Sequence, residues 1–394
     1  MMNMRYKGYI HAFLAAAVIF LTSACIKNDI DYGTSDREVS ISPVTSISAK
    51  SIPGAIVGNR YPFDETMGIM AFHSTAKPGD KWTENDANIA ASNKPHIDKG
   101  EFGYIPEHGA WGGIRTTLVD GKRESVKHDP YLWPENGSLI FAGFSPYYKF
   151  DAVNVDNLSK EGKLKEIKDM VSFNVQTRTL TVKNYIVGQY IPMSPEQILD
   201  PEYEYVNTSQ SDLMFFMPQV TEGKYVGVNK LSAYPARFYH ALSLVEFKVR
   251  AEDDYDVDRI HIDRITLDQV YHTGDFSATI NDDGSISAEW TSLKGQEDIH
   301  VFGDEGGHDE SGELLMDMDY RSVAQLMIIP GPTHPIIVGC HVYTMGKYYN
   351  QTFTINPNDV GIDKWEMGKR YVYNLTIGLN KLEFSPETYE WINN

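Results

Sequence analysis

Apolar and polar residues alternate with a period of two along most of this chain. Between Val245 and Val249 every second residue is apolar and the residues between them are charged, and in the run from Tyr371 to Leu379 every second residue is again apolar. Successive side chains of a β-strand point to opposite faces, so each run predicts a strand with one face on a core and the other in water. A chain built from such runs is expected to fold by pairing its strands into sheets.

Further runs, separated by turn residues, predict additional strands. They are Ser138–Phe144, Met170–Val175, Leu180–Gln189, Asp212–Phe216, Arg259–Leu267, Asp275–Ile280, Ala324–Ile329, Ile336–Tyr343 and Gln351–Ile355. The turn Asn281–Gly284 predicts a hairpin. One segment, Asn157–Asp169, has helical spacing, with Leu158, Leu164 and Ile167 as its apolar positions. Many short strands joined by turns predict an all-β fold of the sandwich type.

The chain is long enough to form two hydrophobic cores. A stretch rich in Gly, Pro and polar residues, Pro218–Ala236, predicts a boundary near Tyr225. We therefore expect two β-sandwich domains in tandem, at 38–224 and 225–394.

The first residues carry an export signal. Two basic residues precede an apolar run, Ala12–Leu21, that is too short to span a bilayer. Small residues then lead to Cys25, so residues 1–24 are predicted to be a signal peptide. A cysteine in this position can carry a diacylglycerol that anchors the protein to a membrane, and the polar residues 25–37 would form a tether. Ordinary secretion with a free Cys25 is the alternative.

Charge and cysteine content exclude several classes of protein. The net charge is -19, and nucleic-acid binding requires clustered basic surface, so no nucleic-acid partner is expected. The cysteines are Cys25 and Cys340, and lipidation of the first leaves no pair for an intrachain disulfide. Stability must then come from burial of a core.

Catalytic motifs are absent from the sequence. It has no Gly-x-Ser-x-Gly elbow, no His-Glu-x-x-His, no Walker loop and no Gly-x-Gly-x-x-Gly after a strand, so we expect no enzyme, no cofactor and no metal. The acidic runs Glu252–Asp258 and Asp304–Glu310 lack the spacing of a calcium loop and are interpreted as solvated turns. His261 and Asp263 share one strand face, which we interpret as an exposed polar face because no further metal ligand can be identified.

Two other groups of residues have a structural and a functional interpretation. His240 is interpreted as a packed structural residue and not as a catalytic base. Five of the six tryptophans could line a sugar platform or belong to the core. They are Trp111, Trp133, Trp290, Trp365 and Trp391.

Several blocks resemble a known family. They are Trp133–Pro146, Asp212–Met214, Phe238–Phe247, the closing block Trp365–Gly368 with Lys369, Tyr371 and Tyr373, and Phe384–Pro386 with Trp391. In this order they are similar to the hallmark segments of the fimbrillin family, the type V pilus subunits of Bacteroidota. The resemblance implies two transthyretin-like or immunoglobulin-like sandwiches, an outer-membrane lipoprotein at the cell surface, and a pilus (fimbrium) assembled from such subunits that contributes to adhesion.

The resemblance also implies strand exchange. A trypsin-like protease removes the first strand, and a C-terminal strand of a neighbouring subunit fills the groove. Here the removable strand would be Glu38–Ile47, with Val39 and Ile41 as apolar residues. Family members carry an arginine soon after this strand, whereas this chain offers Lys50 and then Arg60 as processing sites. If neither is cut, the first strand stays in place, as expected of an anchoring subunit.

The expected donor is Asn380–Asn394, in which Leu382 and Phe384 alternate with polar residues. Pro386 would interrupt the ladder of a central strand, so this tail could instead complete its own domain. Stalk, tip and anchor positions in the pilus stay open. The alternative function is a surface lipoprotein that does not polymerise and binds glycans or a host ligand.

Overall fold

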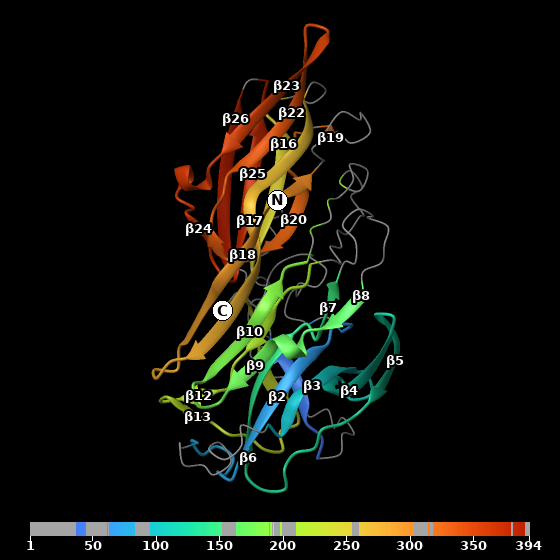
Figure 1. The fold of residues 1–394 in the computed structure, drawn as a ribbon, viewed down its shortest axis with the longest axis vertical. Helices are drawn as coiled ribbons and strands as arrows, with labels where there is room; N and C mark the ends of the chain where they lie inside the picture. The colour runs from blue at the N-terminus through green and yellow to red at the C-terminus, as the bar shows by residue number, and fades with distance from the viewer. Residues whose placement is uncertain are drawn as a thin grey trace, which may run out of the picture.

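The computed structural model describes residues 37–44, 61, 63–82, 95–151, 163–188, 190, 192, 198, 210–253, 260–302, 314–315, 318–379 and 381–390. The elements in them are β-strands, with short 3-10 helices at Lys168–Met170 and Pro357–Val360 (Figure 1). The all-β prediction is confirmed. Within these residues no helix has the length and apolar character that crossing a bilayer requires. Cys25, Lys50 and Arg60 lie outside the described residues.

A nine-stranded sheet, here called the N-terminal sheet, contains most of the early strands. Its order is β14 (Tyr234–Arg237), β1 (Ser40–Val44), β4 (Ala110–Val119), β3 (Ile97–Ile105), β2 (Met67–Ser74), β6 (Ser138–Ser145), β11 (Met214–Phe216) and β15 (Tyr239–His240), with β5 (Lys122–His128) paired to β4. The first strand in the sequence therefore lies inside the sheet, between β14 and β4.

Two further sheets complete the main architecture. The seven-stranded bridging sheet has the order β23 (Lys347–Ile355), β22 (Ile336–Thr344), β17 (Ile260–Ile280), β10 (Thr179–Ile186) and β9 (Val171–Asn174), with β18 (Ile286–Phe302) and β19 (Leu314–Leu315) also paired to β17. The four-stranded C-terminal sheet has the order β20 (Arg321–Ile328), β16 (Ser243–Ala251), β25 (Lys369–Ile377) and β26 (Leu382–Glu390). Short pairs join β7 (Tyr148–Asp151) to β8 (Lys163–Glu166), β12 (Val220–Thr221) to β13 (Lys224–Tyr225), and β21 (Gly331–Pro332) to β24 (Lys364–Trp365).

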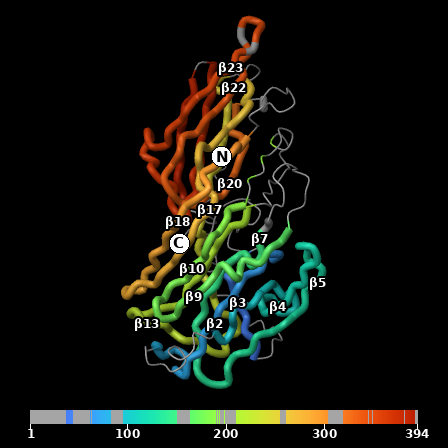
Figure 2. Tube along the Cα trace, viewed as in Figure 1, coloured from blue at the N-terminus to red at the C-terminus, as the bar shows by residue number. Residues whose placement is uncertain are grey.

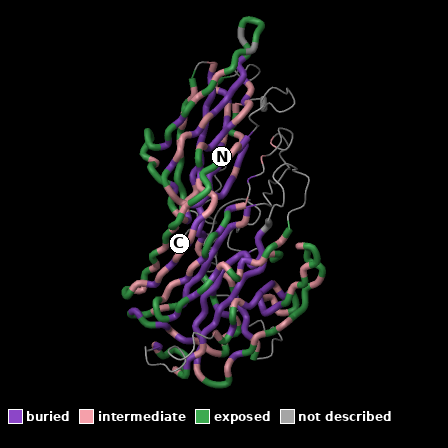
Figure 3. The backbone as a smooth tube through the Cα atoms, viewed as in Figure 1, coloured by how far each residue is buried: buried purple, intermediate pink, exposed green. Residues whose placement is uncertain are grey.

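Both faces of the N-terminal sheet are covered. Phe141 of β6 packs on one face, in a cluster with Met67, Ile69 and Trp111 that is here called the outer core. Phe144 packs on the other face, in a second cluster that is here called the middle core. The middle core also contains Val171, Phe173, Leu180 and Phe276 from β9, β10 and β17. All residues of β6 are consequently buried. Buried residues, drawn in purple, lie mainly along the strands in the interior of the molecule (Figure 3).

The long hairpin β17–β18 links two cores. Ile260 and Ile265 belong to the C-terminal core between the bridging and C-terminal sheets, whereas Phe276 and Ile280 belong to the middle core. The Cα trace shows the hairpin running from the C-terminal half down beside β9 and β10 (Figure 2). Its turn at Asn281–Gly284 confirms the predicted hairpin.

Three sequence predictions are wrong in detail. Within Asn157–Asp169, predicted to be a helix, residues Lys163–Glu166 form strand β8, because each residue pairs with β7. Arg259–Leu267 and Asp275–Ile280 were expected as two strands, but the described part of both belongs to the single strand β17. Glu246 of β16 faces protein and not water, since Arg370 and Gln325 provide it with partners.

The division into domains at 38–224 and 225–394 stays a prediction. Strand pairing crosses the position near Tyr225: β14 pairs with β1, and the far half of β17 pairs with β10. Segments from both sides of that position therefore share sheets and cores.

The aromatic ring of Phe144 in β6 lies against Gly68 of the neighbouring strand β2. Phe144 is the register partner of Gly68, and a Cβ at Gly68 would lie 2.1 Å from its ring. We predict that Gly68→Ala lowers the free energy of unfolding by about 1–3 kcal/mol through overpacking. Urea denaturation measures this loss. Gly331→Ala is the matched control, because its nearest neighbour would be 3.7 Å away. Equal stability of the two variants would contradict the prediction.

Candidate functional site

Strand β1 is an interior strand of the N-terminal sheet, between the terminal strand β14 and β4. It runs antiparallel to β4, with Ile41 opposite Trp111, and parallel to β14, with Ile41 opposite Tyr234. The chain just before it is also held by backbone hydrogen bonds: the Val39 N–H donates to the Tyr131 carbonyl at 2.8 Å. Strand β1 thus has a partner strand on each side, and Ile41 is the residue in register with both.

Val39 and Ile41 point into the outer core. They are 1% and 0% exposed, and the two residues lie on one face because they are two positions apart. Aromatic residues dominate the rest of this core: Tyr61, Phe102, Trp111, Trp133, Phe141, Phe216, Tyr234 and Phe238. Removal of β1 would expose this apolar surface between β4 and β14.

Tyr61 is a buried anchor next to the candidate processing residue Arg60. Its ring packs edge-on to Trp111 at 5.7 Å and lies 5.5 Å from Phe238. Its hydroxyl lies 2.5 Å from the Ser145 hydroxyl. Burial, and next the charge of Glu65, raise the pKa of Tyr61 well above its ordinary value. The phenol therefore stays neutral and keeps this part of the chain fixed in the outer core.

Glu65 is a partly buried acid near this anchor. Burial raises its pKa to about 7, against a hydrogen bond from the Thr66 N–H to its Oε1 at 3.0 Å. Because the folded-state pKa lies above the ordinary value, the neutral form is favoured in the fold. Its contribution to stability is fully present below about pH 4.5 and is lost as pH rises through about 7.

We predict that Glu65→Gln reduces the loss of stability between pH 5 and pH 8 by up to about 3 kcal/mol. The amide keeps an acceptor for the Thr66 N–H but carries no charge. Urea denaturation at both pH values measures the difference. Glu124→Gln, a substitution at an exposed position, is the control and should show the same change in unfolding free energy between the two pH values as the parent chain. A profile for Glu65→Gln that matches the parent would contradict the role given to burial.

A buried side-chain hydrogen bond joins the end of β15 to the segment before β11. His240 Nδ1 lies 2.7 Å from Asp212 Oδ2, and the side chains are 1% and 0% exposed. The interpretation of His240 as a packed structural residue is confirmed. Both residues belong to blocks that supported the family resemblance, so these blocks contain structural pairing residues.

The C-terminal tail forms β26, an edge strand. It pairs antiparallel to β25 along its length, from Ile377–Leu382 to Lys369–Glu390. Leu382 and Phe384 are partly buried against the C-terminal core, where Phe384 packs edge-on to Tyr373 at 5.2 Å. Pro386 fits here because an edge strand has one side without a ladder.

The structure places the two predicted exchange elements in different sheets. Val39 and Ile41 lie in the N-terminal sheet, and Leu382 and Phe384 lie in the C-terminal sheet, so one subunit does not bring them together. The tail completes the sheet of its own chain in this state. The two elements differ physically. Strand β1 has a neighbour on each side, and its residues Val39 and Ile41 are buried, whereas β26 is an edge strand and is mostly exposed.

Burial decides whether the described tryptophans are core residues or line a surface platform. Trp111, Trp133 and Trp365 are at most 8% exposed. Trp290 is partly buried and donates from Nε1 to the Ala241 carbonyl at 2.6 Å. These four are core residues and form no surface platform, and Trp391 lies outside the described residues.

The face that carries His261 and Asp263 is not the solvated face expected. His341 of β22 lies opposite His261 in the register and places Nε2 3.5 Å from Asp263 Oδ2. Burial raises the pKa of Asp263, because its carboxylate is only 15% exposed. The pairing of β17 with β22 supplied the neighbour that sequence spacing could not identify.

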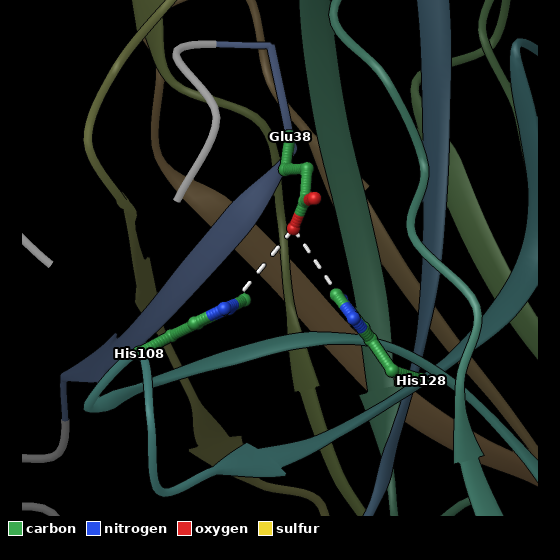
Figure 4. A group of neighbouring side chains, drawn as sticks. All are labelled: Glu38, His108 and His128. Atoms are coloured by element: carbon green, nitrogen blue, oxygen red, sulfur yellow. Dashed lines mark ion pairs between the residues drawn. The ribbon is translucent and has the colours of Figure 1, made fainter. Parts of the chain in front are cut away.

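A second cluster was missed entirely by sequence reasoning. Glu38, His108 and His128 each offer a ligand atom within 4.8 Å of the others (Figure 4). They are far apart in the sequence and form no recognisable spacing, so only the pairing of β1, β4 and β5 brings them together.

Comparison with known protein families identifies the family to which this chain belongs. The family model for fimbrillin-like proteins matches residues 76–391. This match covers well over half of the chain, so the protein belongs to the fimbrillin-like family, which is one of structural fimbrial proteins. The resemblance found in the sequence is thereby confirmed. A comparison with curated proteins gave no match.

Solved structures that match this chain include fimbrial proteins. One is a fimbrial protein from Bacteroides vulgatus ATCC 8482, with a TM-score of 0.48, 14% identity, and coverage of 90% of this chain and 99% of that one. Another is the tip fimbrial protein Mfa3 from Porphyromonas gingivalis with C-terminal truncation, with a TM-score of 0.31, 10% identity, and coverage of 83% and 94%.

Proposed function

We propose that this protein is a structural subunit of a cell-surface pilus that assembles by donor-strand exchange. In this proposal β1 occupies the groove of the subunit until a protease removes it. The observation that carries the proposal is the position of β1: a short strand near the N-terminus lies inside a sheet and covers an aromatic core. An incoming strand could restore both the hydrogen-bond ladder and the apolar contacts.

The tail has the features that a donor needs. Leu382 and Phe384 repeat the two-residue spacing of Val39 and Ile41, so both would enter the outer core from one face. As an edge strand, β26 can leave the C-terminal sheet by breaking a single ladder, the one with β25. A head-to-tail contact of this kind does not close on itself and produces a filament.

Processing would release β1 only if the chain is cut after it. Cleavage after Lys50 or Arg60 meets this condition. A cut after Arg60 would start the mature chain at Tyr61, whose buried ring would hold the new N-terminus at the rim of the groove. Loss of β1 would then leave the other contacts of the outer core in place.

The cellular setting follows from the same proposal. A lipid on Cys25 would anchor the precursor in the outer membrane, where a trypsin-like protease would cut after Lys50 or Arg60. The other partners would be further pilus subunits. The protein would have no enzymatic activity, and two β-sandwich domains would form each link of the fibre.

The test uses the full chain and a Lys/Arg-specific protease. A new N-terminus after Lys50 or Arg60, together with a heat-labile ladder on denaturing gels, is the expected result. The double variant Lys50→Gln and Arg60→Gln should remain a monomer, whereas Arg178→Gln, a control away from the cut region, should form the ladder. A trimmed protein that stays monomeric and binds a glycan saturably would favour the alternative of a stand-alone binding lipoprotein.

A further inference from the structure

Glu38, His108 and His128 converge next to the strand that the proposed function removes. Glu38 Oε2 lies 3.3 Å from His128 Nε2 and 4.0 Å from His108 Nδ1. The view in Figure 4 shows both imidazoles directed at one carboxylate oxygen. The Glu38 and His108 side chains are 17% exposed and that of His128 is 38% exposed, so an ion from solvent can reach the cluster.

The backbone fixes where these side chains start. Glu38 forms a bridge with Leu132 just before β1. His108 lies in the turn between β3 and β4, where its N–H donates to the Ile105 carbonyl at 3.0 Å. His128 ends β5 and pairs with Ile114 of β4. The cluster therefore depends on little more than side-chain rotation to adjust its geometry.

The donor set selects a class of ion. Two imidazole nitrogens and one carboxylate oxygen suit zinc and related transition metals, whereas calcium and magnesium prefer oxygen ligands alone. Ligand atoms about 2 Å from a tetrahedral zinc lie about 3.3 Å apart, which matches the Glu38–His128 distance and requires a small closure toward His108. Three protein ligands leave a fourth position for water.

We propose that Glu38, His108 and His128 bind a divalent transition metal of the zinc type, and that the bound metal clamps β1 in the sheet. One ligand lies on the segment that cleavage would remove, and two lie on the part that would remain. Glu38 would leave with the removed segment, whereas His108 and His128 stay on the β3–β4–β5 meander. The metal site is complete only while β1 is seated.

The consequence for assembly rests on the proposed function. Metal that binds the seated state and not the released state shifts the equilibrium toward the seated state by mass action. At a free metal concentration of 100 times Kd, the fraction of molecules with β1 detached falls about a hundredfold. Metal availability would thereby regulate when the groove opens to a donor strand.

Binding is tested first, on the full chain and with Zn²⁺ alone. Isothermal titration calorimetry should show one site that Glu38→Gln, His108→Ala and His128→Ala each weaken at least about tenfold. His272→Ala is the matched control, since His272 lies 3.8 Å from Glu297 in a pair without a second histidine. A triple variant that binds Zn²⁺ with the affinity and stoichiometry of the parent would overturn the site.

The clamp is tested by amide hydrogen exchange in β1. Zn²⁺ should slow exchange of Ser40–Val44 in the parent chain and in His272→Ala, but not in the triple variant. Zn²⁺ binding without added protection of β1 would refute the clamp. If binding and protection are both seen while trimmed protein never polymerises, the proposed pilus function fails and the metal clamp stands.

Discussion

Ile41→Ala is expected to lower the free energy of unfolding of the intact chain by about 2–5 kcal/mol. Ile41 is 0% exposed and packs among the aromatic residues of the outer core, so truncation leaves a cavity there. Urea denaturation of the full chain measures the effect. Ser42→Ala is the control in the same strand, because Ser42 is exposed. A loss below about 0.5 kcal/mol for Ile41→Ala would mean that β1 does not complete the core.

Strand exchange adds a second expectation for the same variant. Once a protease has removed β1, Ile41 is gone, and subunits made from Ile41→Ala should polymerise as well as the parent. Phe384→Ala should behave in the opposite way: a smaller loss of monomer stability, since Phe384 is only partly buried, but weaker polymers. Ladder intensity after trimming measures both. If the two variants affect polymers equally, the assignment of leaving strand and donor strand is refuted.

Asp212→Ala is expected to lower the free energy of unfolding by about 1–3 kcal/mol, because a buried hydrogen-bonding group loses its partner. The substitution leaves His240 in a site that is 1% exposed without the carboxylate that it meets at 2.7 Å. Removing both partners should cost less, so the double variant Asp212→Ala with His240→Leu is expected to recover part of the loss. Thermal or urea unfolding of the parent, Asp212→Ala, His240→Leu and the double variant completes the cycle.

An exposed pair provides the control for this prediction. Arg115 and Asp129 also lie 2.7 Å apart, but their side chains are 74% and 45% exposed. Arg115→Ala should therefore cost no more than about 1 kcal/mol. Equal losses for Asp212→Ala and Arg115→Ala would show that burial does not set the strength of the His240 pair.

The alternation of residue types predicted much of the fold. The apolar positions Val245, Phe247 and Val249 are buried in β16, as their period of two requires. Ser138–Phe144 was also predicted correctly as a strand and lies in β6, which has protein on both faces. Lys163–Glu166 was mistaken for part of a helix, since four residues paired with β7 are too few for period alone to decide.

The candidate sites divide in the same way. Val39, Ile41, Leu382 and Phe384 were selected as candidates from their spacing and from the family resemblance, because the proposed strand exchange would depend on local alternation. The clusters of Glu38 with His108 and His128, and of Asp263 with His341, could not be selected, because each joins residues from strands distant in sequence.

The sequence by itself determined the β class, the family and the apolar positions of most strands, because these depend on neighbouring residues and on short blocks. Only the tertiary structure decided that β1 is an interior strand while β26 is an edge strand, and that residues of β17 belong to two cores. It also decided that Glu38 lies close to two histidines. The physical reason is that a strand's own pattern specifies which face is buried. Its neighbours in the sheet are selected by the packing of the whole chain.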